Sequence, residues 1–215
     1  MKNVFLYILI FLAGFADGLL AAEDFSDAPE YSQVSTAVSE TLGSYEHALQ
    51  AWKTPEDINA WIASNFSYDM NRSMRLSETQ VTQQGQPTIY TPSEFFSIKS
   101  GTCVDLSRFA VETLKIINPQ YDPKYLMIEF YPITIDGNML RRHWLVSFKR
   151  DGQTYFFADS NRPGLVLGPF NAPEEFIREY ERYRGRRIVA FRQMESYQKD
   201  HRVRTLKLKA PQKRR

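Results

Sequence analysis

Five segments of the chain carry the apolar spacing or the start signals of amphipathic helices. The periodicity is clear after Cys103, where Leu106, Ala110, Leu114 and Ile117 share one face. The five segments are residues 35–52, a helix that begins at residue 55, a short helix that begins at residue 92, residues 103–117 and residues 173–184. Between the second and third helices, residues 69–90 are polar, and they are predicted to form a long surface loop.

Three of these helices begin with the same local signal. Thr54, Thr91 and Thr102 are each followed three residues later by Asp or Glu, as in a capping box. Proline follows the first two of these threonines and suits the first helical position. With Thr102 as the cap, Cys103 becomes the first residue of its helix.

The second half of the chain changes to patterns typical of strands. They cover residues 125–133, 142–149, 153–159 and about 187–192. Helices followed by antiparallel strands predict an α+β domain, in which the helix that begins at Cys103 packs on an antiparallel sheet.

The hairpin around Arg150-Asp151-Gly152 fixes the relation between two polar side chains. A three-residue loop with Gly last pairs residue 149 with residue 153. That register places His143 directly opposite Asp159, with both side chains on one face. A two-residue Asp-Gly loop would put them on opposite faces.

The first residues resemble an export signal. Lys2 is followed by an apolar run over residues 4–13, which is too short to span a membrane as a helix. We therefore expect a signal peptide at 1–22 and a periplasmic or secreted protein, with an uncleaved N-terminal membrane anchor as the alternative. An extension and helix would occupy 23–53, the main domain 54–195, and a tail 196–215.

Composition and charge add limits on partners. Hydrophobic residues make up 43% of the 215 residues and aromatic residues 14%, which indicates a globular domain. Net charge is +2, but seven of the 27 basic residues follow Asp200, where no acidic residue occurs. This tail is either a solvated terminus or a contact for an anionic surface. We expect a monomer with no specific nucleic-acid partner.

The single cysteine is the candidate nucleophile. At a helix N-terminus, free N–H groups and the helix dipole favour the thiolate of Cys103. His143 would be its base, and Asp159 would orient the imidazole. Each residue also has a structural interpretation: an inert buried thiol, a strand histidine bonded to backbone, and a turn cap.

A thiol enzyme also needs donors for the oxyanion. The backbone N–H of Cys103 is one candidate. Gln84, Tyr68 and Trp144 are candidates for the second donor or for substrate contact, and the sequence does not choose among them. No zinc-ligand spacing is present.

The segments Gly101-Thr102-Cys103-Val104-Asp105-Leu106-Ser107, His143-Trp144 and Asp159 resemble the transglutaminase-like superfamily. The resemblance implies a papain-like core with Cys on a helix N-terminus and His and Asp on adjacent strands. The separations of 40 and 16 residues are similar to those of bacterial periplasmic transglutaminase-like cysteine proteinases. Those proteins have acidic residues on both sides of Cys, and some bind calcium there. This chain has Thr102 and Val104 at those places, so we expect no cofactor and no calcium dependence.

The resemblance implies a cysteine hydrolase that acts on amide or peptide bonds through an acyl-thioester on Cys103, and the signal-like N-terminal segment predicts that this enzyme is exported. A polypeptide or a cell-wall peptide is the expected substrate. The alternatives are an acyl transferase that crosslinks or amidates proteins, a catalytically inactive binding domain, and a thiol-exchange protein.

Overall fold

The computed structural model describes residue 27 and residues 43–77, 87–135, 138–198 and 204–205. The predicted signal peptide, residues 35–42 of the helix predicted over 35–52, Gln84 and most of the basic tail lie outside the described residues. Within the described ranges, no helix is long and apolar enough to cross a membrane.

The helices that carry capping-box signals begin where these signals predict, whereas the continuous helix predicted over residues 35–52 is wrong, because Ser44 is extended and caps a helix that begins at Tyr45. Capping boxes at Thr54 and Thr91 start two of them, and Cys103 is the first residue of the longest. The helices are α1 (Tyr45–Ala51), α2 (Pro55–Asn65), α3 (Met70–Leu76), α4 (Pro92–Ile98), α5 (Cys103–Ile117) and α6 (Pro173–Arg184), with a short 3-10 helix at Pro119–Tyr121. The prediction of a loop over 69–90 missed α3, which Asp69 caps by accepting from the Arg72 N–H at 2.9 Å.

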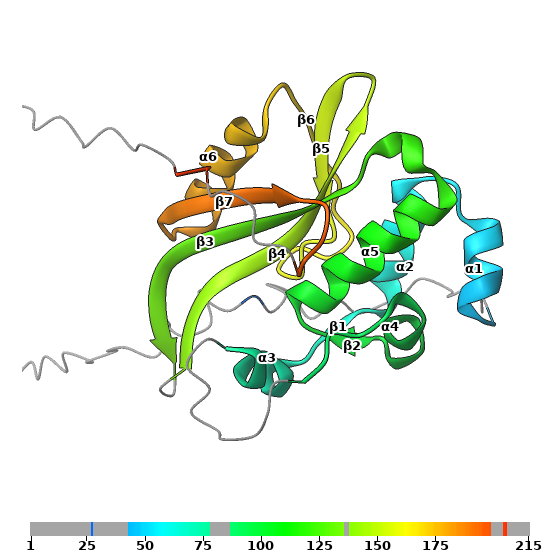
Figure 1. Cartoon of the computed structure of the whole chain (residues 1–215), viewed down its shortest axis with the longest axis horizontal. Helices are drawn as coiled ribbons and strands as arrows, with labels where there is room; N and C mark the ends of the chain where they lie inside the picture. The colour runs from blue at the N-terminus through cyan, green and yellow to red at the C-terminus, as the bar shows by residue number, and fades with distance from the viewer. Residues whose placement is uncertain (1–26, 28–42, 78–86, 136–137, 199–203, 206–215) are drawn as a thin grey trace, which may run out of the picture.

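The strands form a six-stranded antiparallel sheet in the order β6-β5-β4-β3-β7-β8. They are β3 (Lys124–Ile135), β4 (Asn138–Arg150), β5 (Gln153–Phe157), β6 (Leu167–Phe170), β7 (Ile188–Met194) and β8 (Arg204–Thr205). A separate parallel pair joins β1 (Ser67–Tyr68) to β2 (Ser100–Gly101), just before α5. The α+β prediction is confirmed (Figure 1).

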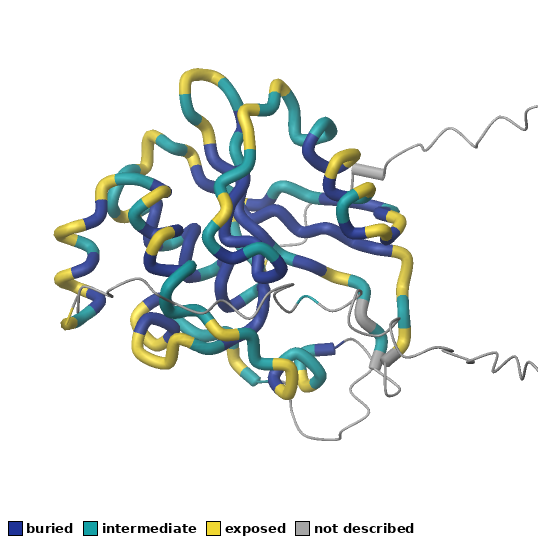
Figure 2. Tube along the Cα trace, turned by 180° about the vertical axis from the view of Figure 1, so that it is seen from behind, coloured by how far each residue is buried: buried dark blue, intermediate teal, exposed yellow. Residues whose placement is uncertain are grey.

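Helices cover both faces of the sheet (Figure 1). On one face, Leu106 and Phe109 of α5 share a buried cluster with Val146 of β4. On the other face, Phe156 of β5 stacks on Phe176 of α6 with ring centroids 3.9 Å apart. Figure 2 shows the buried residues concentrated along the central strands. Each fully buried side chain of this size stabilises the fold by roughly 1.5–3 kcal/mol, so both helices are fixed against the sheet.

The β4–β5 hairpin differs by one residue from the prediction. Arg150 pairs with Gln153, and Asp151 and Gly152 form a two-residue turn with φ values of 50° and 76°. Positive φ at both turn positions is typical of a type I′ hairpin. The predicted three-residue loop is therefore wrong, because Asp-Gly satisfies the tighter turn, whose twist matches that of the strands.

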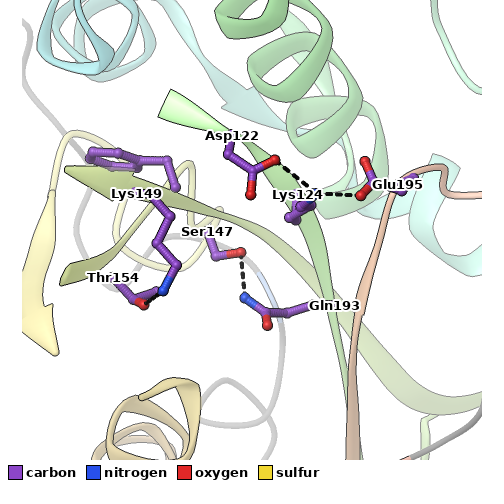
Figure 3. A pocket seen from close by; sticks show the side chains of 8 residues that line it. Asp122, Lys124, Ser147, Lys149, Thr154, Gln193 and Glu195 are labelled. Atoms are coloured by element: carbon purple, nitrogen blue, oxygen red, sulfur yellow. Dashed lines mark hydrogen bonds and ion pairs between the residues drawn. The ribbon is translucent and has the colours of Figure 1, made fainter. Parts of the chain in front are cut away.

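A polar hollow lies over β3, β4 and β7 (Figure 3). Lys124 forms ion pairs with Asp122, at 2.8 Å, and with Glu195. Gln193 Nε2 donates to Ser147 Oγ at 2.9 Å. These groups bond to one another, which indicates a structural network rather than a reactive site.

Candidate active site

The entry to α5 is built to hold Cys103 in one place. The carboxylate of Asp105 accepts the Thr102 N–H at 3.0 Å and the Thr102 hydroxyl at 2.8 Å. A Cβ added to Gly101 would lie 2.9 Å from the Phe95 ring, so the residue before the cap has no room for a side chain. The thiol therefore sits on the first residue of a helix whose start is tightly packed.

A buried ion pair also holds the N-terminus of α5. Arg72 of α3 binds Asp105 through two contacts of 2.8 Å, and the side chains are 7% and 0% exposed. The Tyr90 N–H donates to the same carboxylate at 3.0 Å, and the Arg72 guanidinium lies 3.7 Å above the Tyr90 ring. Asp105 thus completes the cap and also joins α3 to α5, a role that no local sequence pattern indicated.

His143 and Asp159 meet despite the shifted register. His143 Nε2 lies 3.0 Å from Asp159 Oδ1, and both residues are buried. The register would place Asp159 on the opposite face, but β5 ends at Phe157 and Ala158 adopts a φ of 55°. This left-handed residue redirects the chain, and Asp159 turns toward the imidazole.

Tyr180 of helix α6 and Arg162, which precedes β6, both contact Asp159 of this pair. The Tyr180 hydroxyl donates to Asp159 Oδ1 at 3.0 Å, and its ring stacks on the His143 ring at 5.8 Å. Arg162 Nε donates to Asp159 Oδ2 at 3.3 Å. The residues of α6 were not among the sequence candidates, because the helix carries no catalytic motif.

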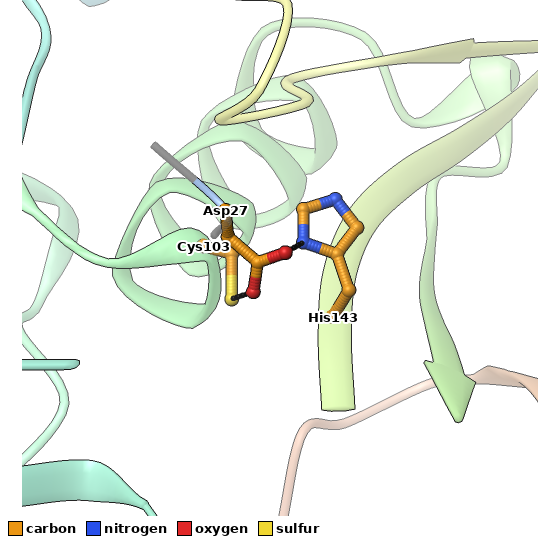
Figure 4. A group of neighbouring side chains, drawn as sticks. All are labelled: Asp27, Cys103 and His143. Atoms are coloured by element: carbon orange, nitrogen blue, oxygen red, sulfur yellow. Dashed lines mark hydrogen bonds and ion pairs between the residues drawn. The ribbon is translucent and has the colours of Figure 1, made fainter. Parts of the chain in front are cut away.

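A second carboxylate, from Asp27, lies between the thiol and the imidazole (Figure 4). Its Oδ1 is 3.0 Å from His143 Nδ1, and the Cys103 thiol is 3.8 Å from its Oδ2. Arg184 of α6 lies 3.1 Å from Oδ1, and Ser160 Oγ donates to the Asp27 carbonyl at 2.7 Å. Sequence reasoning missed Asp27, which lies in a polar stretch with no motif.

The chain also matches a known protein family. Residues 33–188 match the family model for the transglutaminase-like domain, which covers most of the chain. The chain belongs to this family. No curated protein matches.

Three solved structures of LapG from Legionella pneumophila are similar to this transglutaminase-like protein, each at 16% identity. The calcium-bound structure covers 76% of both chains, with a TM-score of 0.39. A second structure covers 67% of this chain and 70% of its own, and an EGTA-treated one covers 67% and 68%, both with a TM-score of 0.36.

Neighbouring opposite charges shift the pKa values at the site of this transglutaminase-like domain. Burial opposes the charged form of His143, but Asp27, Tyr180 and Asp159 outweigh it and hold the pKa of the imidazole well above its usual value. Burial likewise opposes ionisation of Asp159, yet His143 and the arginines nearby lower its pKa to about 2. The imidazolium and the Asp159 carboxylate are therefore the favoured forms.

The pKa of the Cys103 thiol differs from the sequence expectation. Burial and the negative charge of Asp27 raise the pKa of Cys103, and they outweigh His143 and the backbone N–H of Trp144, which lower it. A helix N-terminus was expected to favour the thiolate. With Asp27 in place that expectation is wrong, because burial and the neighbouring carboxylate both oppose the thiolate.

The structure describes two of the three residues predicted as the second oxyanion donor or substrate contact. Trp144 lines the hollow that opens onto Cys103, and its backbone N–H interacts with the thiol. The Tyr68 hydroxyl donates to Ser73 Oγ at 2.9 Å, and it does not line this hollow. Gln84 lies outside the described residues.

The residues around Cys103 do not fit the acidic pattern with which some bacterial periplasmic transglutaminase-like proteinases bind calcium. Thr102 and Val104 offer no carboxylate, and both oxygens of Asp105 are bound by Arg72. In the part of the chain that the structure describes, the one group of His, Cys and acidic residues close enough to hold a metal ion is Asp27, Cys103 and His143, whose ligand atoms lie within 4.8 Å of one another. The absence of a cofactor stays a prediction.

Proposed function

We propose that this transglutaminase-like protein is an exported cysteine hydrolase that cleaves amide or peptide bonds through an acyl-thioester on Cys103. One observation carries the proposal. The thiol, the two ring nitrogens of His143 and the Asp159 carboxylate follow one another in space, with Nδ1 on the side of the thiol and Nε2 at 3.0 Å from Asp159. This is the order that nucleophilic catalysis requires.

The reaction would run in two steps, with Asp27 displaced. The Cys103 thiolate attacks the carbonyl carbon and forms a C–S bond, and negative charge develops on the carbonyl oxygen. His143 donates its Nδ1 proton to the leaving nitrogen, the C–N bond breaks, and the acyl-thioester remains. Water then gives a proton to Nδ1 and attacks the thioester. The C–S bond breaks, which frees the carboxylic acid and restores the thiolate.

Asp159 would act through the imidazole. Its contact at Nε2 fixes the ring so that Nδ1 carries the exchangeable proton on the thiol side. The oxyanion would be stabilised by the N–H of Cys103, since the first N–H groups of a helix have no partner within it. Trp144, on the wall of the hollow, is the better placed of the remaining candidates.

Export, the substrate class and the monomeric state extend the proposal. The apolar run near the N-terminus supports export to the periplasm or the medium, where polypeptides and cell-wall peptides are available substrates. An anchored form would present the same domain at the membrane surface.

An experiment can separate hydrolysis from its alternatives. Purified wild-type and Asp27→Ala proteins are incubated with an unfolded polypeptide and with a cell-wall peptide, and Cys103→Ser is the control. New amino termini found by mass spectrometry support hydrolysis. Incorporation of an added primary amine instead indicates an acyl transferase. No product with either protein, while the fold is intact, would contradict the enzymatic proposal and favour a binding domain.

A further inference from the structure

Cys103, His143 and Asp27 bring three kinds of metal-ligand group to one point of the molecule. One sulfur, one imidazole nitrogen and one carboxylate oxygen lie within 4.8 Å of one another. Asp27 Oδ1 is 3.0 Å from His143 Nδ1, and Asp27 Oδ2 is 3.8 Å from the Cys103 sulfur. Figure 4 shows the carboxylate between the thiol and the ring. No short motif indicates this set, because Cys103 is 76 residues from Asp27 and 40 from His143.

The separations of these atoms suit a tetrahedral Zn²⁺ ion. Zinc binds sulfur at about 2.3 Å and nitrogen or oxygen at about 2.0–2.2 Å, so its ligand atoms lie roughly 3.3–3.6 Å apart. Shifts of about 1 Å would bring the three atoms to that spacing. Thiolate and imidazole ligands favour zinc, whereas calcium takes roughly six to eight oxygen ligands. The chemistry of the set therefore favours zinc over calcium.

The imidazole of His143 is oriented as a metal ligand. Asp159 lies 3.0 Å from Nε2, which leaves Nδ1 on the side of the thiol. A carboxylate on the second ring nitrogen is the usual support of a zinc-binding histidine, because it fixes the tautomer and makes the ligand more basic. Among the described residues, buried Nδ1 has no hydrogen-bond partner of good geometry, although Asp27 Oδ1 is 3.0 Å away. This nitrogen is therefore placed to bind a metal ion.

The carboxylate of Asp27 has support of its own. Arg184 lies 3.1 Å from Oδ1, and Ser160 Oγ donates to the Asp27 carbonyl at 2.7 Å. Oδ2 faces the sulfur, so this oxygen can bind an ion while Oδ1 keeps its contact with the guanidinium. The nearby positive charge does not exclude zinc. Because Zn²⁺ would replace the thiol proton and the imidazolium proton, its binding leaves the net charge of the centre unchanged.

A hollow beside the three ligands gives an ion access from solvent. The hollow has a volume of about 300 Å³, and Asp27, Cys103 and Trp144 are among the residues that line it. Zinc sites with three protein ligands keep the fourth position for water or another small ligand. The hollow has room for that water.

We propose that Cys103, His143 and Asp27 bind Zn²⁺, with water as the fourth ligand, and that the bound ion blocks the catalytic centre. The ion would occupy the sulfur and Nδ1, which are the two groups that the proposed reaction uses. Zinc would therefore be a reversible inhibitor and not a cofactor. The inhibition rests on the proposed function, whereas the metal site itself does not require any hydrolytic activity.

Cobalt reports the ligands of such a site directly. Co²⁺ can take the place of Zn²⁺, and a thiolate ligand gives it an intense charge-transfer band in the near ultraviolet. Metal-free wild type, Cys103→Ser and His143→Ala are titrated with Co²⁺, and Zn²⁺ is then added in competition to obtain its affinity. We expect the band in wild type and its loss in Cys103→Ser, with weaker binding in His143→Ala. Zn²⁺ should displace Co²⁺, and Ca²⁺ should not.

Variants at Asp27 test the third ligand. Loss of a group outside the coordination sphere typically weakens metal binding about 10–100-fold, and a ligand contributes more. Asp27→Ala and Asp27→Asn should therefore each weaken Zn²⁺ binding by at least about tenfold. Asp122→Asn is the matched control, because it removes a carboxylate that pairs with Lys124 and lines a different hollow. It should leave the affinity unchanged.

Thermal unfolding shows which of these variants are folded. If Asp27→Ala does not fold, Asp27→Asn keeps the shape of the side chain and still removes the anionic ligand. A thiolate band in wild type, together with weaker Zn²⁺ binding in the folded Asp27 variants, supports the site. No thiolate band in wild type, or the same Zn²⁺ affinity with and without the Asp27 carboxylate, would overturn it.

The results also separate this inference from the proposed function. Zinc binding through the three ligands in a protein without hydrolytic activity would support the site and leave the hydrolase proposal to fail alone. Hydrolysis by a protein that gives no thiolate band with Co²⁺ would overturn the site and leave the proposed function intact.

Discussion

The Tyr180 hydroxyl donates a 3.0 Å hydrogen bond to Asp159 Oδ1, the same oxygen that lies 3.0 Å from His143 Nε2. The Tyr180 ring also stacks on the imidazole. A helix far along the chain from Cys103 therefore holds the buried side of the candidate triad. The position of His143 therefore depends on α6 as well as on its own strand.

Tyr180→Phe should weaken this support while it keeps the ring. The variant loses two buried hydrogen bonds, one donated to Asp159 and one accepted from Arg184, which should lower the free energy of unfolding by about 1–3 kcal/mol. A less firmly held Asp159 should also shift the pH dependence of Cys103 alkylation. Tyr45→Phe is the matched control, because Tyr45 makes a buried 2.8 Å hydrogen bond to Thr113. It should lower stability and leave the pH profile unchanged. The same profile in both variants would argue against a positioning role for Tyr180.

The left-handed residue Ala158 should be sensitive to the branching of its side chain. It is fully buried at a φ of 55°, a conformation that β-branched residues rarely adopt. Ala158→Val should cost about 1–3 kcal/mol in the free energy of unfolding and displace Asp159 from His143. Ala158→Gly accepts this φ and should keep alkylation near the wild-type rate. Equal behaviour of Val and Gly would contradict the account of how Asp159 reaches His143.

Arg72→Met should be strongly destabilising. It leaves the fully buried carboxylate of Asp105 without its cation, and breaking such a pair typically costs about 3–5 kcal/mol. The control is Glu56→Gln, which removes the partner of Arg150 in a pair whose side chains are 48% and 30% exposed. Exposed pairs contribute about 0–1 kcal/mol. Chemical denaturation of both variants measures the difference, and similar losses would show that the buried pair does not anchor α5.

The stability that Asp159 provides should depend on pH. Its folded pKa of about 2 lies below the unfolded value of about 3.9, so the ionised form favours the folded state. This contribution is complete above about pH 4 and is lost as the pH falls toward 2. The stability difference between wild type and Asp159→Asn should therefore shrink over that range in thermal unfolding. A constant difference would indicate that Asp159 keeps an ordinary pKa.

Local signals explain what the sequence could predict. The caps at Thr54 and Thr91, and the start of α5 at Cys103, depend on neighbours within one turn, and the structure has them where expected. The sequence does not define the hairpin register, because Arg150-Asp151-Gly152 is compatible with both turn lengths. The contact between His143 and Asp159 forms nevertheless, because of Ala158, whose conformation no sequence pattern indicated.

Contacts between residues far apart in the chain explain what the sequence could not predict. Asp27 and Arg184 meet across a separation of 157 residues, and neither belongs to a motif. Burial and the charge of Asp27 together raise the pKa of Cys103. Such a meeting depends on the packing of α6 against the sheet, which periodicity does not define.

The most direct test of the central claim is the rate of Cys103 alkylation by iodoacetamide from about pH 5 to about pH 9, measured in Asp27→Ala with and without His143→Ala. If Cys103 and His143 form a nucleophile–base pair, the thiol of Asp27→Ala should react well below the ordinary Cys pKa of about 8.5. The added His143→Ala should return it to that value. An ordinary thiol in both proteins would contradict the pair and, with it, the enzymatic account.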